Sequence, residues 1–281
     1  NGLLRRWSED PQTTAALLGA VQNTNALVRL TAVRSLEPAL VTSPVVKAAM
    51  ERLLNDTDRA IRVEAAWALH ETLDTNSTAG RELLDYLRQN LDQPTGQLQM
   101  GTFFLDRNQP QPALEHLQRA VSWDTNSAPL HHALAVAFSV TGKPQEAVRA
   151  MRDACRLAPR EAEYRFKLAL ALNEVGKLNE AVPEFENAVQ LSPQFVQAWY
   201  NLGLAYAALH KPELALEKLS RAEALNPTAP QFPYARATIL AQTSRLNEAR
   251  KAALRVLEIQ PTHAEAAALL QQLDAMPSSN R

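Results

Sequence analysis

The chain has 281 residues, 46% of them hydrophobic and 21% charged, which is enough apolar material for a packed core and excludes a chain that is disordered throughout. Its 29 basic and 30 acidic side chains leave a formal net charge of −1, so we expect no nucleic-acid-binding surface. The single cysteine, Cys155, excludes an intramolecular disulfide, and no apolar run approaches the ~18–20 residues of a membrane span. Only 8 glycines occur and alternating runs of Val, Ile and Thr are missing, which predicts an all-α protein.

The sequence of the N-terminal third of the chain predicts a first set of helices. The sequence begins Asn1-Gly2-Leu3 without a methionine or a signal-peptide pattern, so we expect a processed or excised segment, with residues 3–10 the remnant of a helix. One pattern then occurs twice within residues 12–73, at a spacing of 33 residues, as Val28-Arg29-x2-Ala32-x3-Leu36 and Ile61-Arg62-x2-Ala65-x3-Leu69. Asn25 and Asp58 precede the two copies as N-caps, and Ser77 or Thr78 caps a bridging helix at 78–91.

The stretch Leu53-Leu54-Asn55-Asp56-Thr57-Asp58-Arg59-Ala60-Ile61-Arg62 resembles the short bacterial HEAT-like repeat. The resemblance implies that Arg29 and Arg62 have a structural role, in which each side chain packs along an inner helix and holds the adjacent loop.

From about residue 94 the chain repeats every 34 residues. Small residues recur in three columns, because paired helices approach closely only where side chains are small. A fourth column carries prolines that end the second helix of each pair. The columns are Gly101, Ala135, Ala169, Gly203 and Ala237; Ala113, Ala147, Ala181, Ala215 and Ala249; Ala120, Ala154, Ala188, Ala222 and Val256; and Thr125, Pro159, Pro193, Pro227 and Pro261. Gly142 and Gly176 stand where the first helix of a pair must end, which predicts a left-handed backbone there.

This pattern resembles the tetratricopeptide repeat, with the best unit reading Trp199-x2-Leu202-Gly203-x2-Tyr206, then Ala215-x3-Leu219 and Pro227. The resemblance implies a right-handed α-solenoid of HEAT-like helix pairs followed by five tetratricopeptide repeats and a cap helix. We expect the HEAT-like segment at residues 1–92 and the tetratricopeptide superhelix at 94–276. Its units begin near residues 94, 128, 162, 196 and 230, and the cap helix spans 264–276.

No catalytic or metal-binding pattern stands out. GxxxxGK[ST], GxSxG and HExxH are all absent, and the six histidines lack the i,i+3 or i,i+4 spacing of helical metal ligands. Cys155 lies near a helix end in a small-residue region, which favours a buried, inert thiol over a reactive thiolate. We therefore expect no enzyme, no cofactor and no metal.

A partner-binding groove is the more informative prediction. The resemblance implies that the residue after each Trp-like position faces the concave side. With neighbouring positions this gives a candidate site of His132, Phe166, Lys167, Leu170, Asn173, Tyr200, Asn201, Leu204, Tyr234 and Thr238. The alternative is that the aromatic residues of this column pack against the next repeat. Lys167 is the lone cation near the middle, so we expect no grip on an acidic tail, while a neutral peptide would fit.

The leading hypothesis is a non-catalytic scaffold that binds a protein or peptide, but no nucleic acid, on the concave surface. A second hypothesis rests on Ala60-Ile61-Arg62-Val63-Glu64-Ala65-Ala66-Trp67-Ala68-Leu69 and Glu163-Tyr164-Arg165-Phe166, which resemble the C-terminal region of bacterial multihaem c-type cytochromes. It implies an electron-transfer protein or complex in the periplasm or cell envelope, whose haem-binding CxxCH motifs lie outside this chain. If the cytochrome resemblance does not hold, we expect a cytoplasmic location.

Overall fold

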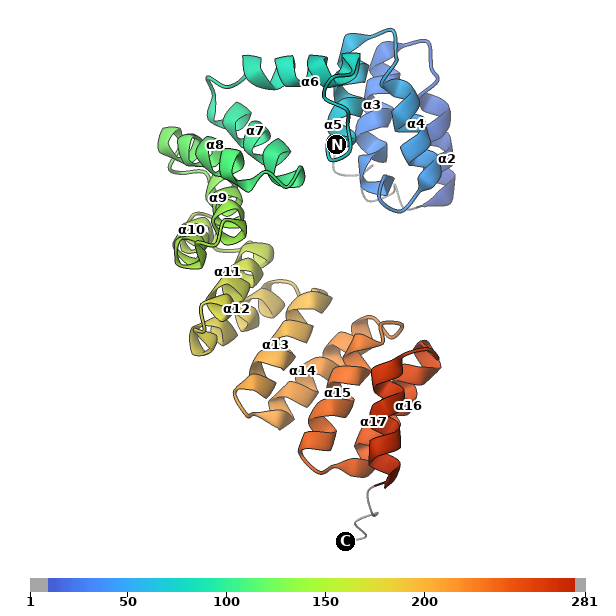
Figure 1. Ribbon diagram of the computed structural model, residues 1–281, viewed down its shortest axis with the longest axis vertical. Helices are drawn as coiled ribbons and strands as arrows, with labels where there is room; N and C mark the ends of the chain where they lie inside the picture. Colours follow the sequence, from blue (N-terminus) through green and yellow to red (C-terminus); the bar gives the residue numbers. More distant parts are fainter. Residues whose placement is uncertain (1–9, 276–281) are drawn as a thin grey trace. The chain divides into compact units, whose positions relative to one another are not determined.

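All regular structure in the described part of the chain is helical. The computed structural model describes residues 10–275, which form sixteen α-helices and one short 3-10 helix without any strand (Figure 1). The all-α prediction is therefore confirmed. The chain forms two compact units, residues 1–125 and 126–281. The helix remnant expected at residues 3–10 falls, except for Asp10, outside the described residues, as does Met276 at the end of the expected cap helix.

The first unit consists of helices joined by short turns. Polar side chains start several of them, because the first backbone N–H groups of a helix need an acceptor. Asn25, Asp58 and Ser77 accept from the backbone N–H groups of Leu27, Ala60 and Gly80, which confirms these predicted caps. The helices are α2 (Pro11–Ala20), α3 (Ala26–Leu36), the 3-10 helix η1 (Glu37–Ala39), α4 (Pro44–Leu53), α5 (Arg59–Ala68), α6 (Thr78–Gln89), α7 (Pro94–Asp106) and α8 (Pro110–Trp123).

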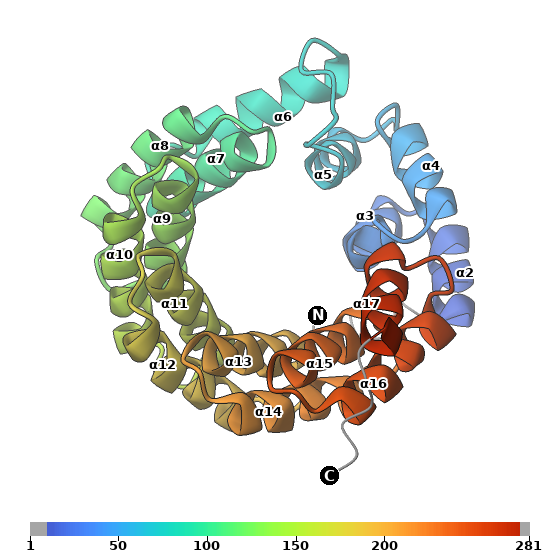
Figure 2. The same cartoon turned by 60° about the horizontal axis from the view of Figure 1, so that its bottom comes forward.

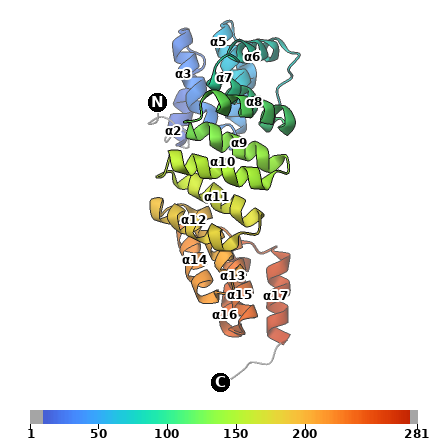
Figure 3. The ribbon, with the colours of Figure 1, turned by 90° about the vertical axis from the view of Figure 1, so that its left-hand side faces the viewer.

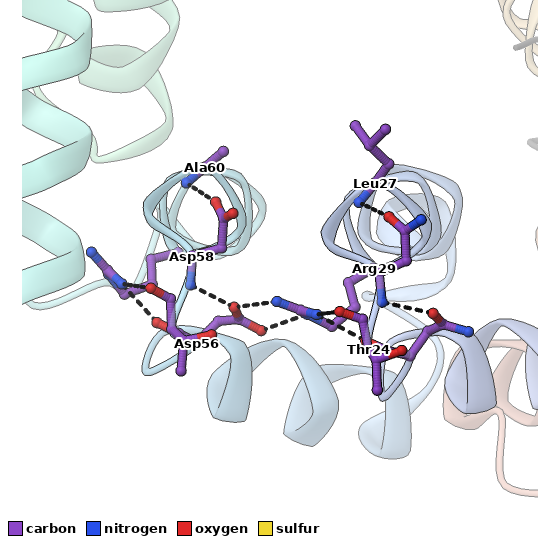
Figure 4. Close-up of polar contacts among 10 residues, drawn as sticks. Thr24, Leu27, Arg29, Asp56, Asp58 and Ala60 are labelled. Carbon is purple, nitrogen blue, oxygen red and sulfur yellow. Dashed lines mark hydrogen bonds and ion pairs between the residues drawn. The ribbon is translucent and has the colours of Figure 1, made fainter.

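Two arginines hold the loops of the first unit in the same way. Arg29 donates from Nη1 to the carbonyl oxygens of Asn23 and Thr24, at 2.8 and 3.1 Å, and Arg62 does the same to Asp56 and Thr57, at 2.7 and 3.1 Å (Figure 4). The predicted structural role of Arg29 and Arg62 is confirmed.

The remaining donors of both arginines reach carboxylates. Arg29 binds the Asp56 carboxylate through Nε and Nη2, both at 2.9 Å, and Arg62 binds Glu82 at 2.8 and 2.6 Å. Burial opposes ionisation of Asp56, but hydrogen bonds from Arg29 and from the Asp58 backbone outweigh it and lower the pKa of Asp56. Arg29 thus joins the start of α3 to the loop before it and to the loop before α5, and Arg62 joins the start of α5 to its own loop and to α6.

The second unit is a stack of antiparallel helix hairpins. Its helices are α9 (Ala128–Val140), α10 (Pro144–Leu157), α11 (Ala162–Glu174), α12 (Leu178–Leu191), α13 (Val196–Ala208), α14 (Pro212–Leu225), α15 (Gln231–Gln242), α16 (Leu246–Ile259) and α17 (Ala264–Ala275). Figure 3 shows the hairpins following one another in chain order. Figure 2 shows α9, α11, α13 and α15 as one layer and α10, α12, α14 and α16 as another, and we call these the inner and outer layers.

The small-residue columns lie where the two layers meet. Ala181, Ala188, Ala215 and Ala222 are all fully buried. A Cβ atom placed on Gly203 would lie 2.7 Å from Cγ of Leu219 on the partner helix, so only glycine fits there without rearrangement. The predicted close approach of paired helices is confirmed.

The left-handed position between paired helices recurs with the repeat. Gly142 and Gly176 have φ of +72° and +75°, as predicted from their place at the end of a helix. The same 34-residue register carries Asn108, His210 and Ser244, with φ of 54°, 56° and 61°. The hairpin turn therefore keeps its geometry even where the sequence has lost the glycine.

Candidate partner-binding face

Each helix of the inner layer turns one side toward its partner helix and leaves the other accessible. On α13 the buried residues include Leu202, Gly203 and Tyr206, while Gln197, Leu204 and Ala208 are exposed at spacings of 7 and 4 residues. We call the accessible sides of α9, α11, α13 and α15 together the inner face. The predicted site residues all belong to these four helices.

Apolar side chains are exposed on two helices of the inner face. Val136 and Val140 on α9 are 37% and 57% exposed, and Leu204 on α13 is 38% exposed. Leu204 was among the predicted site residues, whereas Val140 was not. The sequence could have indicated Val140, because it follows Val136 by four residues and both valines therefore lie on one side of α9.

The helix between them, α11, is more polar. Asn173 and Glu174 are exposed, and Leu170 and Lys167 are half-buried. Glu174 accepts a hydrogen bond from Oγ of Ser139 on α9, at 3.1 Å, so a polar contact links neighbouring hairpins across the inner face. The inner face thus alternates apolar and polar strips.

The amide and hydroxyl groups at Asn201 and Thr238 bind their own helices. Nδ2 of Asn201 donates to the carbonyl oxygen of Gln197 at 2.8 Å, and Oγ1 of Thr238 donates to that of Tyr234 at 3.0 Å. Oδ1 and the second N–H of the Asn201 amide, and the lone pairs of Thr238, are therefore not used within these helices. Both side chains are half-buried.

The aromatic residues of the predicted site pack against other aromatic rings of the second unit. Phe166 is only 7% exposed and lies against Phe185 and Phe195, with ring centroids 5.8 and 4.8 Å away. Its large face is therefore used inside the protein. Phe185 and Phe195 both precede α13, so this ring packs within its own helix pair and the following turn, not against the next repeat.

The other aromatic residues at the same repeat position as Phe166 are half-buried. Tyr200 packs on Phe232 at 5.3 Å, His132 on Tyr164 at 5.1 Å, and Tyr234 on His263 at 5.0 Å. Unlike Phe166, the rings of Tyr200, His132 and Tyr234 keep part of their surface accessible. Burial raises the pKa of Tyr200, so its phenol stays a neutral hydrogen-bonding group.

His132 is the one predicted site residue with an unmet polar atom. Its Nε2 is buried and has no hydrogen-bond partner among the described residues. Burial lowers the pKa of His132, and the charge of Lys167 acts in the same direction while Glu163 opposes both. The imidazole of His132 is therefore neutral at neutral pH, and a neutral ring fits an apolar surface better than a charged ring does.

Reactive groups do not gather on this face. Cys155 is 3% exposed on outer helix α10, and burial raises the pKa of its thiol to about 11, so it is a buried thiol as predicted. Within residues 10–275, no group of three His, Cys, Asp or Glu side chains is arranged to hold a metal ion. No helix among these residues is long and apolar enough to cross a membrane.

Comparisons with known proteins agree with the repeat pattern. Family models described as TPR repeat and tetratricopeptide repeat match residues 171–209 and 196–229. The chain therefore carries tetratricopeptide repeats in this region. The count of five, the HEAT-like repeats and the segment boundary near residues 92–94 remain predictions. No curated protein matches the chain.

Several solved structures share the fold. MamA of Desulfovibrio magneticus RS-1 is 20% identical with a TM-score of 0.57, covering 61% of this chain and 97% of that one. YrrB, described as a TPR protein with an unusual peptide-binding site, is 18% identical with a TM-score of 0.58, covering 67% and 97%. PilF of Pseudomonas aeruginosa is 26% identical with a TM-score of 0.56, covering 67% and 84%. These likenesses support a tetratricopeptide α-solenoid.

Proposed function

We propose that the chain is a non-catalytic scaffold that binds a protein or peptide partner on the inner face of its second unit. The observation that carries this proposal is the exposure of Val136, Val140 and Leu204 on helices of one layer. Exposed apolar side chains gain free energy when a partner removes them from water. YrrB supports the proposal because it is a similar solenoid described as having a peptide-binding site.

The chemistry of the inner face points to a largely uncharged segment. Its apolar strips lie on α9 and α13, and the polar groups between them are those of Asn173, Glu174 and Lys167. One lysine and one carboxylate on the same helix give no concentrated positive field for an acidic tail. We infer that the partner presents apolar side chains, from a helix or an extended strand, with polar groups over α11.

A matched pair of substitutions tests the proposal. Leu204 on α13 and Leu214 on α14 are each 38% exposed, but they belong to the inner and outer layers. Leu204→Lys should lower the yield of a partner captured from the native source about tenfold or more, because a charge replaces a central apolar contact. Leu214→Lys carries the same chemical change and should leave capture unchanged.

The outcome separates binding from folding. Far-ultraviolet circular dichroism and the melting temperature should be equal in both variants, since both positions are accessible in the folded chain. Undiminished capture by Leu204→Lys, or equal loss in both variants, would place the partner on another surface and contradict the proposal.

The cytochrome hypothesis concerns residues outside this chain. It predicts several CxxCH motifs in the encoding sequence upstream of Asn1. Sequencing that region tests it, because a reading without such motifs removes the hypothesis.

A further inference from the structure

A pocket of about 520 Å³ lies in the first unit among α3, α5, α6 and α7. Apolar and aromatic side chains from three of these helices line it, among them Leu30, Val63, Trp67 and Tyr86. Tyr86 is 41% exposed, so part of this aromatic residue is accessible at the pocket. The volume lies in the range of small-ligand and side-chain pockets.

Contacts outside the pocket hold the Trp67 side chain in place. His70 stacks on Trp67 with ring centroids 4.9 Å apart, and Nε2 of His70 lies 2.7 Å from a carboxylate oxygen of Asp106 on α7. Arg107 donates to the carbonyl oxygens of His70 and Leu73, at 2.7 and 2.9 Å, and so holds the turn after α5. A wall held in place loses little conformational freedom when a ligand packs on it.

Among the described residues, one of the two arginines that line the pocket has no hydrogen bond or ion pair. Arg34 and Glu64 form two parallel hydrogen bonds of 2.9 Å and neutralise each other. Arg59, at the start of α5, is exposed and makes no hydrogen bond or ion pair with a described residue, although its charge acts on Glu82. Two arginines and one glutamate give the lining a net charge of +1.

We propose that this pocket is a second binding site, which takes a large apolar side chain of a peptide partner whose neighbouring residue is Asp or Glu. The apolar side chain packs between Trp67 and Tyr86, and the carboxylate pairs with Arg59. The Gln99 amide at the pocket offers both a donor and an acceptor to the peptide backbone. The negative charge of the occupant thus complements the net charge of +1 on the residues that line the pocket. The site belongs to the first unit and does not depend on the proposed function of the second.

Two capped tetrapeptides test the inference with the full chain. One is acetyl-Gly-Phe-Asp-Gly-amide and the other is its Asn analogue, which has the same shape without the charge. The chain is labelled with ¹⁵N at its tryptophan indoles, and the Trp67 signal is assigned through Trp67→Phe. We expect a saturable shift of the Trp67 signal, with about fivefold tighter binding of the Asp peptide, the size of an accessible charge contact.

Variants then separate the two parts of the site. Arg59→Ala should weaken the Asp peptide about fivefold and leave the Asn peptide unchanged. Tyr86→Ala should weaken both peptides about tenfold, because it removes an aromatic wall. Arg119→Ala removes an exposed arginine of α8 in the same unit and serves as the charge-matched control, with no expected effect.

Arg59 and Tyr86 are exposed, so their removal should leave the melting curve unchanged. An unshifted Trp67 signal would overturn the inference, as would equal affinities for the two peptides or an Arg59→Ala variant that still prefers the Asp peptide. Because the readout is Trp67 in the first unit, these results are independent of capture by the inner face.

Discussion

The substitution Gly203→Ala tests the close approach of paired helices. A Cβ atom at this position would lie 2.7 and 2.9 Å from Cγ and Cδ2 of Leu219 and 3.2 Å from the carbonyl oxygen of Ala215. Leu219 is fully buried and cannot move into solvent. The helices must therefore separate or the leucine must leave its rotamer.

Two opposing terms set the size of the effect. Alanine in place of glycine within a helix gains about 1 kcal/mol from backbone entropy. Overpacking of a full core costs about 1–3 kcal/mol. We expect the second term to exceed the first and the variant to lose about 1 kcal/mol of unfolding free energy. Gly19→Ala is the matched control: Gly19 is helical with no atom within 4 Å of the added Cβ, so only the gain remains.

The neighbouring hairpins suggest a compensating change. Sixteen residues after the small position, Ala135 is followed by Met151 and Ala169 by Phe185, while Gly203 is followed by Leu219. Methionine is unbranched and adapts to a larger neighbour. The double variant Gly203→Ala with Leu219→Met should recover most of the lost stability.

Urea unfolding followed by circular dichroism gives the required free energies, provided that the slope with urea stays the same in all variants. A Gly203→Ala variant as stable as Gly19→Ala would refute the packing argument. So would a double variant that is the sum of its single changes, since residues in contact should couple.

Three further predictions concern the turns and titratable groups. His210→Gly should stabilise the chain by about 1 kcal/mol, because φ is +56° there, and Gly176→Ala should destabilise it by a similar amount in the same urea assay. His132→Phe should raise stability at pH 7 by about 1 kcal/mol by removing a buried nitrogen without a partner. Burial lowers the pKa of His132, so protonation of this side chain favours the unfolded chain. The free energy of unfolding is therefore highest above pH 6.5 and falls as pH drops from 6.5 through the lowered pKa of the folded chain. The melting temperature of His132→Phe should change less than that of the unaltered chain between pH 7 and 5. Hydrogen bonds from Arg62 lower the pKa of Glu82, so that pair should stabilise the fold above pH 4.5 and fail as pH falls below it, and Glu82→Gln should remove this part of the acid transition.

The periodicity of the sequence predicted the helices well. Helices begin at Ala128, Ala162, Val196 and Gln231, near the residues at which we expect repeat units to start, and one helix spans Thr78–Gln89 within the expected 78–91. The division of the chain into repeat units stays a prediction. Such accuracy has a physical cause: small residues and helix-ending residues recur because every hairpin repeats the same close contact and the same turn.

The candidate site was harder to predict. Helical spacing identifies the side of a helix on which a residue lies but not how deeply its neighbours cover it. Phe166 stands in the predicted column yet is buried, because Phe185 and Phe195 from other parts of the chain lie against it. The pocket beside Trp67 was missed for a related reason, since its residues come from four helices and helical spacing does not show where those helices leave a cavity.

Methyl NMR on the complex with a captured partner tests the central claim most directly. The accessible methyl groups of Val136, Val140 and Leu204 belong to the inner layer, and those of Leu191, Leu214 and Leu254 belong to the outer layer. The account predicts that partner binding shifts the inner-layer methyl signals and leaves the outer-layer ones unchanged. Shifts confined to Leu191, Leu214 and Leu254 would contradict it.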